Sequence, residues 1–181
     1  MFEIDTWIVE YPVCQYQVLK TEEIPFSEKV RHICRTECER YGKSWSCPPG
    51  VGEVEECRRR CMGFEHVLVF TTMAEVADAS IMSETLLTRG EHEKTARALC
   101  EELKKRGASC FMLSSESCQI CEICAYPEEC RCPEKAIPCV ESYGILVTEI
   151  AEKCGIDFYY DNHTVTWFGL IFFKKENDDF L

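Results

Sequence analysis

The sequence predicts an α/β fold: a single compact domain in which a small mixed sheet is flanked by helices and carries two cysteine-rich loops. Three observations lead to this prediction. Two apolar, strand-like runs at 66–72 and 108–113 enclose a helical pattern at 83–106, an order typical of a right-handed crossover between parallel neighbours. A further apolar stretch at 164–173 predicts a last strand. The 181 residues contain no repeat or linker, so we expect residues 1–181 to form one domain.

The first third of the chain is read from its proline, serine and glycine positions. Residues 1–26 are expected to form an extended arm or strand, in which prolines interrupt regular pairing. Ser27 is a suitable N-cap for a helix over 27–41. The residue before a proline is biased toward extended geometry, so the Cys-Pro-Pro-Gly sequence at 47–50 must be a turn. A second helix is expected at 54–62.

The rest of the chain alternates regular elements with one irregular stretch. The long central helix should end at Gly107 as a C-cap. Residues 114–138 have neither helical nor strand periodicity, so their order must come from something other than apolar packing, and a metal site is the natural source. A helix is then expected at 139–154, followed by strands at 158–160 and 164–173.

Composition and charge narrow the function classes. The formal net charge is −12, with 20 Lys and Arg against 32 Asp and Glu, which disfavours binding to nucleic acid or anionic lipid. The sequence lacks both an apolar run of membrane-spanning length and a secretory N-terminal pattern, so we expect a soluble, cytoplasmic protein. In a reducing compartment, 15 cysteines, an odd number, are better explained by metal binding than by a disulfide framework.

The strongest motif is a run of thiols in the irregular stretch, within 118–133. Its spacing, Cys-x2-Cys-x2-Cys, lets successive thiolates turn inward from one tight loop, as ferredoxin-type loops do around a 4Fe-4S cluster. Zinc is the alternative, because four thiolates also form a tetrahedral structural site, although zinc sites more often use two separated Cys-x2-Cys pairs. The predicted ligands are Cys118, Cys121, Cys124 and Cys130, with Cys132 as a further candidate.

A second motif, within 34–47, contains three cysteines: Cys34, Cys38 and Cys47. The first two are four residues apart and share one face of a helix, and the Pro-Pro turn can fold the third back toward them. Three thiolates leave one iron of a cubane open to substrate, unless Cys57 or Cys61 completes the set. We interpret that pair as core, because free cysteine is among the most buried residue types.

The remaining cysteines stand apart from these motifs. Cys139 follows a proline at an expected helix start, where the helix dipole lowers a thiol pKa, so it is either a reactive thiolate or a substitute N-cap. We interpret the other isolated cysteines as core residues: Cys14, Cys100, Cys110 and Cys154.

Taken together, these motifs resemble the family of predicted metal-binding proteins called domain of unknown function 2284. The resemblance covers most of the chain and implies metal binding, with seven matching cysteines, but no reaction. Two positions depart from the family pattern, Cys132 and Cys139, and either is an alternative to Cys130 as a ligand. The resemblance is carried by Cys34, Cys38, Tyr41-Gly42-x2-Trp45-x-Cys47-Pro48-Pro49, Cys118-x2-Cys121-x2-Cys124, Cys130-Arg131-x-Pro133 and Pro138-x2-Glu141-x2-Gly144-Ile145-x-Val147.

Three functions follow as hypotheses. The first is a redox module with one or two 4Fe-4S clusters that relays electrons to a partner enzyme, whose basic patch would fit an acidic surface. The second is a small oxidoreductase or sulfur-transfer enzyme that binds a small-molecule substrate at the open iron of the Cys34, Cys38 and Cys47 cluster. The third is a structural zinc protein that presents an interaction surface. The sequence assigns no catalytic residue and leaves open whether the protein is an enzyme.

Overall fold

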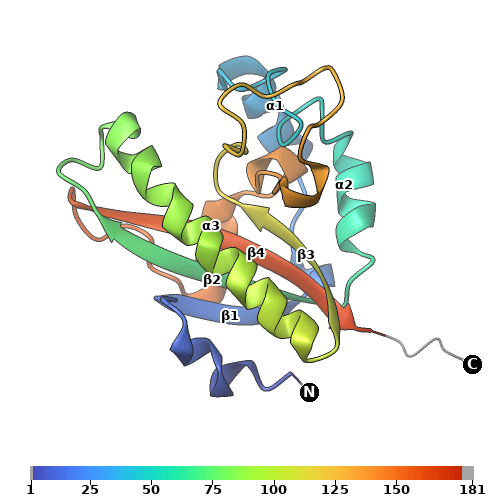
Figure 1. The fold of residues 1–181 in the computed structure, drawn as a ribbon, viewed down its shortest axis with the longest axis vertical. Helices are drawn as coiled ribbons and strands as arrows, with labels where there is room; N and C mark the ends of the chain where they lie inside the picture. Colours follow the sequence, from blue (N-terminus) through green and yellow to red (C-terminus); the bar gives the residue numbers. More distant parts are fainter. Residues whose placement is uncertain (1, 177–181) are drawn as a thin grey trace, which may run out of the picture.

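The protein is built on one four-stranded sheet, seen in the computed structural model, which describes residues 2–176 (Figure 1). The strand order is β1-β2-β4-β3, and every neighbouring pair is antiparallel. This confirms the predicted α/β class with a single sheet and flanking helices. The strands are β1 (Gln15–Lys20), β2 (His66–Glu75), β3 (Ala108–Ser114) and β4 (Thr164–Lys175).

The expected parallel pair is wrong. β2 and β3 run in the same direction, but β4 lies between them and forms hydrogen bonds with both. The physical reason is the apolar character of β4, in which seven consecutive residues from 167 to 173 are buried. A strand that is buried on both faces belongs in the middle of a sheet rather than at its edge.

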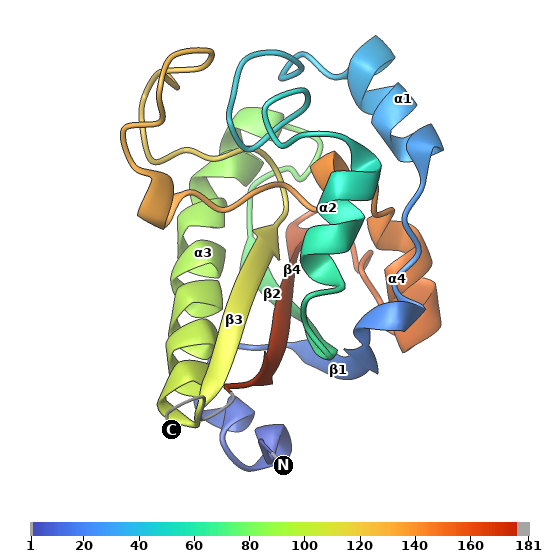
Figure 2. The same ribbon diagram turned by 90° about the vertical axis from the view of Figure 1, so that its right-hand side faces the viewer.

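The alternation of side chains along β4 builds a core on each face of the sheet. Phe168, Leu170 and Phe172 point into one core, whereas Ile171 and Phe173 point into the other. The first core is covered by α2 and α4, and the second by α3 (Figure 2). The result is three layers: helix, sheet and helices.

The helices agree with the predicted ones in most places. Ser27 caps α1, because its hydroxyl accepts a hydrogen bond from the backbone N–H of Lys29 at 3.2 Å. Gly107 follows the long helix with a φ of 80°, as expected of a C-cap glycine. The helices are α1 (Glu28–Glu37), α2 (Val54–Cys61), α3 (Met82–Lys105) and α4 (Val147–Cys154).

Three local expectations need correction. The helix expected at 139–154 is broken, since Gly144 adopts a φ of 79° and only the part from Val147 onward is α-helical. No strand forms at 158–160, where the side chains are exposed. The extended arm at 1–26 contains two 3-10 turns before β1, because Trp7 and Ile8 bury their side chains against α3 and the sheet.

Both cysteine-rich segments lie at the same end of the sheet. The stretch 38–53 and the stretch 115–138 run side by side beyond the end of β3, away from the N-terminal turns (Figures 1 and 2). Apart from a 3-10 turn at Pro133–Lys135, residues 115–138 are irregular, as predicted. Within residues 2–176, none of the helices combines the length and apolar character that a bilayer crossing needs.

Candidate metal centre

The first cysteine group, Cys34, Cys38 and Cys47, lines one cavity of about 540 Å³. The helix α1 places Cys34 on its last turns and ends with Cys38 as its C-cap, and the turn before Pro48 brings Cys47 back to the same cavity. The predicted trio is therefore gathered in one place. The same cavity is also lined by apolar residues, which include Met82, Leu146, Phe158, Val165 and Trp167.

Two thiols of this group, those of Cys34 and Cys47, are at least partly buried, whereas Cys38 is exposed. Burial, with smaller contributions from the neighbouring Cys38 and Cys34, raises the pKa of Cys47 to about 11, although the Ser46 hydroxyl opposes the change. Burial, together with Cys38 and Glu141, also raises the pKa of Cys34. In the free protein these thiols keep their protons near neutral pH, so metal binding here must release protons.

The second cysteine group, Cys118, Cys121, Cys124, Cys130 and Cys132, surrounds a small cavity of about 20 Å³. All four ligands predicted in this loop, and the alternative Cys132, contact the same space. Three residues of the first cysteine-rich stretch also line it: Ser44, Trp45 and Ser46. The two segments thus build the second site jointly.

Within the second group, the pKa shifts of Cys118 and Cys124 have opposite directions, since burial dominates and raises the pKa of Cys118. Burial raises the pKa of Cys124, but four hydrogen bonds outweigh it and the net pKa is lowered. The donors are the backbone of Tyr126, Trp45 and Ala125 and the hydroxyl of Ser44. Backbone N–H groups pointing at a thiolate are the surroundings that stabilise sulfur ligands and tune an iron–sulfur potential.

Contacts with the scaffold hold the irregular loop in place. The indole N–H of Trp45 donates to the carbonyl of Glu128 at 2.7 Å, and the Trp45 ring packs edge-on against Tyr126 with centroids 5.0 Å apart. At the start of the loop, the buried Arg89 of α3 donates to the carbonyl of Ser115 at 2.9 Å. The loop therefore has anchors that its own sequence does not reveal.

Ser46 links the two groups. Its hydroxyl accepts a hydrogen bond from the backbone N–H of Cys118 at 2.8 Å and lies 3.9 Å from the sulfur of Cys47. Arg40 also lies between the groups: it lines the first cavity and a neighbouring hollow beside the second group, and it donates to the hydroxyl of Ser117 at 2.9 Å. Sequence reasoning missed both residues. The only signal was the position of Ser46 directly before Cys47.

Cys57 and Cys61 lie outside both groups. Both are 0% exposed and pack into the core between α2 and the sheet. The Cys57 thiol donates to the carbonyl of Val51 at 3.5 Å and lies 3.7 Å from a guanidinium nitrogen of Arg31. These positions agree with the interpretation of this pair as core cysteines.

The surroundings of Cys139 differ from those expected. It precedes a short 3-10 turn whose N-cap is Val140, so it is neither at a helix start nor a cap. Burial raises its pKa well above the usual value, and Glu141 and Cys47 add to the effect, which is opposite to the expected lowering. The thiol donates to a carboxylate oxygen of Glu141 at 2.9 Å. Cys139 lines the first cavity, beside Cys34, Cys38 and Cys47.

The four isolated cysteines are only partly core residues. Cys100 is buried, and Cys110 and Cys154 are half-buried at the edges of the two cores. Cys14 is exposed just before β1, so its assignment to the core is wrong. None of these four lines a cavity shared with either cysteine group.

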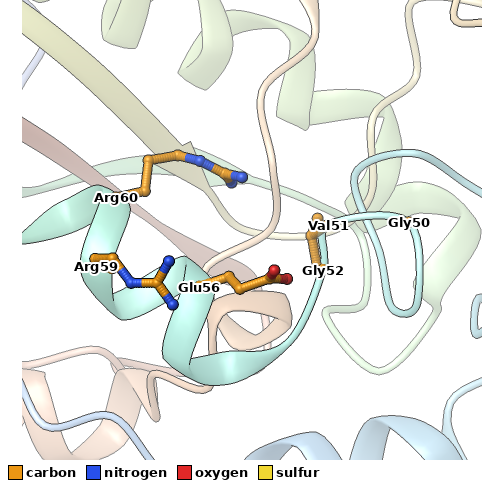
Figure 3. Close-up of a pocket in the computed structure, with 6 residues that line it drawn as sticks. All are labelled: Gly50, Val51, Gly52, Glu56, Arg59 and Arg60. Carbon is orange, nitrogen blue, oxygen red and sulfur yellow. The ribbon is translucent and has the colours of Figure 1, made fainter.

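A separate hollow of about 500 Å³ lies at the start of α2, lined by Gly50, Val51, Gly52, Glu56, Arg59 and Arg60 (Figure 3). Arg59 and Glu56 extend on one side of the helix, and Arg60 lies on the other. The Arg60 guanidinium is engaged in a hydrogen bond with the hydroxyl of Tyr143 and lies over its ring. No cysteine lines this hollow, so it is not a candidate thiolate site.

The donor sets fit iron–sulfur chemistry in kind, because both groups consist of thiols and the second provides hydrogen bonds to sulfur. In the described part of the chain, residues 2–176, no three His, Cys, Asp or Glu side chains stand in an arrangement that could hold a metal ion. A family model described as "Predicted metal-binding protein (DUF2284)" matches residues 17–173. No curated protein and no solved structure matches the chain.

Proposed function

The chain belongs to the DUF2284 family of predicted metal-binding proteins, and from this premise we propose that it is an iron–sulfur protein that binds two 4Fe-4S clusters and relays electrons to a partner enzyme. The observation that carries the proposal is the gathering of the cysteines into two groups, each around its own cavity, at one end of the sheet. Nine of the 15 cysteines line these two cavities, so the groups do not reflect a uniform scatter of thiols.

The closeness of the two groups supports a relay. Ser46 contacts the backbone of Cys118 and lies next to the sulfur of Cys47, so the two sites share a wall that includes Ser46. Arg40 adds a positive charge between them, which favours the extra negative charge of reduced clusters. The net charge of −12 suits docking to a basic surface on a partner protein.

A second candidate, a cluster-dependent enzyme, is favoured by the size of the first cavity. A volume of about 540 Å³ lies in the range of small-molecule sites, and its apolar walls leave room for a substrate beside the cysteine trio. In this case the Cys34, Cys38 and Cys47 cluster would carry out reductive or sulfur-transfer chemistry at an open iron. The cluster of the second group would then supply electrons.

The experiment that tests the proposal is purification without oxygen, followed by iron and sulfide counts and EPR of the reduced protein. We expect a brown protein with about eight irons and about eight acid-labile sulfides per chain, corresponding to two cubanes. A colourless protein with stoichiometric zinc and no sulfide would overturn the proposal and favour a structural zinc site. A count of about four irons per chain would support the iron–sulfur assignment but contradict the presence of a second cluster.

A further inference from the structure

We propose that Cys139 is the fourth protein ligand of the cluster at the first cysteine group, an inference that rests on the proposed function. A cubane has four irons, whereas Cys34, Cys38 and Cys47 supply three thiolates. A fourth thiolate would have to reach the same cavity without disturbing the core. Cys139 is the cysteine that the fold brings there from a distant part of the sequence.

The backbone on both sides fixes Cys139 next to Cys47. Its N–H donates to the carbonyl of Ser46 at 3.1 Å, one residue before Cys47. Residues on either side of Cys139 pair with Ser114 at the end of β3, through hydrogen bonds of 3.0 and 2.9 Å. The end of β3 and the loop that carries Cys47 therefore both hold the backbone of Cys139. This positions its thiol at the cavity before any cluster binds.

Glu141 contacts both the Cys139 thiol and the Cys34 thiol of the trio. One of its carboxylate oxygens accepts from the Cys139 thiol at 2.9 Å, and its main-chain carbonyl accepts from the Cys34 thiol at 3.9 Å. The two thiols therefore contact one residue that itself lines the cavity. On loading, the S–H bond of Cys139 breaks, its proton passes to the Glu141 carboxylate, and the thiolate sulfur bonds to iron.

The competing cysteines are excluded by position. Cys57 and Cys61 are 0% exposed and line neither of the two cavities, so either could reach a cluster only by unpacking the core beneath α2. Cys130 and Cys132 line the second cavity. With four thiolates, the first cluster would be closed, which favours electron transfer over substrate binding at iron.

The test compares the wild type with C139A, C139S and C57A, all purified without oxygen. C57A is the matched control, because it also removes a buried thiol, but one that lies in the core and lines neither cavity. Iron content and EPR of the reduced protein are recorded before and after the addition of cyanide, a small anion that binds an open iron. The signal of the second cluster reports whether each variant is folded.

We expect the wild type and C57A to hold about eight irons and to show EPR signals that cyanide leaves unchanged. C139A should lose about one iron per chain on brief exposure to air, and one of its two signals should become sensitive to cyanide. C139S should keep the iron with a shifted signal, since its hydroxyl can replace the thiol as a ligand and in the hydrogen bond to Glu141.

Two outcomes would overturn the inference: cyanide changes the wild-type signal, or C139A and C139S both match the wild type. If C139A loses both clusters through misfolding, C139S decides the question, and an unshifted C139S signal counts against a ligand role. A wild-type protein without iron and sulfide would instead overturn the proposed function, so the two failures are distinguishable.

Discussion

At the scale of single residues, the surroundings of each sulfur separate cysteines that look alike in the sequence. Cys57 lies in the core beside an arginine, whereas Cys124 receives four hydrogen bonds in an irregular loop. Spacing identified the loop cysteines, because successive thiols close together in sequence must share a site. Spacing could not identify Ser46 or place Cys139, since their partners are 72 and 93 residues away in the sequence.

His92 makes the stability of the fold sensitive to acid. It is buried on α3, its Nε2–H donates to the carbonyl of Phe168 at 3.0 Å, and its Nδ1 accepts from the hydroxyl of Thr72 at 2.8 Å. Burial, with a smaller contribution from the nearby Arg89, lowers its pKa from 6.5 to about 4, although the hydrogen bond to Phe168 opposes the change. Folded protein therefore keeps His92 neutral at a pH where the unfolded chain binds a proton.

The contribution of His92 should be complete above pH 6.5, the unfolded pKa, and should fall as the pH drops toward 4. Its size is about 3 kcal/mol, to order of magnitude. Urea unfolding at pH 7 and at pH 4.5 measures the loss. H92Q keeps a neutral side chain able to donate and accept hydrogen bonds but does not titrate, so its free energy of unfolding should vary less between the two pH values. Equal losses in H92Q and the wild type would contradict this account.

At the scale of elements, a glycine in β4 makes room for an aromatic ring on the face of the sheet that α3 covers. A Cβ on Gly169 would lie 2.4 Å from the ring of Phe70, its cross-strand partner on β2, and 3.2 Å from a ring nitrogen of His92. Phe70 is 0% exposed and stacks on the His92 ring with centroids 5.3 Å apart. The aromatic ring thus occupies the space that a side chain on β4 would fill.

We predict that G169A lowers the free energy of unfolding by about 1–3 kcal/mol, because the buried ring must leave its position. G90A is the matched control: Gly90 lies inside α3 with nothing within 4 Å of its added Cβ, and it should gain about 0.5–1 kcal/mol from helix propensity. Thermal unfolding by circular dichroism gives both values. A neutral G169A would show that Phe70 has room to move.

The elements also show where sequence patterns succeed. Ser27 and Gly107 set the ends of two helices through local hydrogen bonds and backbone conformation, and such signals need no knowledge of the rest of the fold. The break at Gly144 has a tertiary cause, since a Cβ there would lie 3.0 Å from the carbonyl of Ser27. The central position of β4 is likewise a matter of which strands pair, which periodicity does not specify.

At the scale of the whole molecule, the chain divides into a packed scaffold and an end that carries the cysteines. Apolar periodicity predicted most helices and strands of the scaffold, and the spacing of the cysteines predicted which of them belong to each motif. The position of the two motifs beside each other could not be predicted in this way. It depends on contacts between residues that are distant in sequence, such as Trp45 with Glu128 and Arg89 with Ser115.

This division predicts different results for two cysteine substitutions. C124S should lose about four irons per chain, the content of one cubane, and should loosen residues 114–138, which have no apolar periodicity. C100S removes a buried thiol between α3 and the sheet and should keep its iron. Iron counts and limited proteolysis followed by mass spectrometry measure both effects. Equal iron loss in the two variants would refute the division.

The shared wall between the cysteine groups has a consequence for the order of cofactor assembly. Ser46 fixes the backbone of Cys118 through its hydroxyl and that of Cys139 through its carbonyl, and it directly precedes Cys47. Ordering this short segment costs conformational entropy once, whichever site fills first. The site filled second then meets a wall that is already rigid, so the two loading steps should be positively cooperative, with few half-loaded chains.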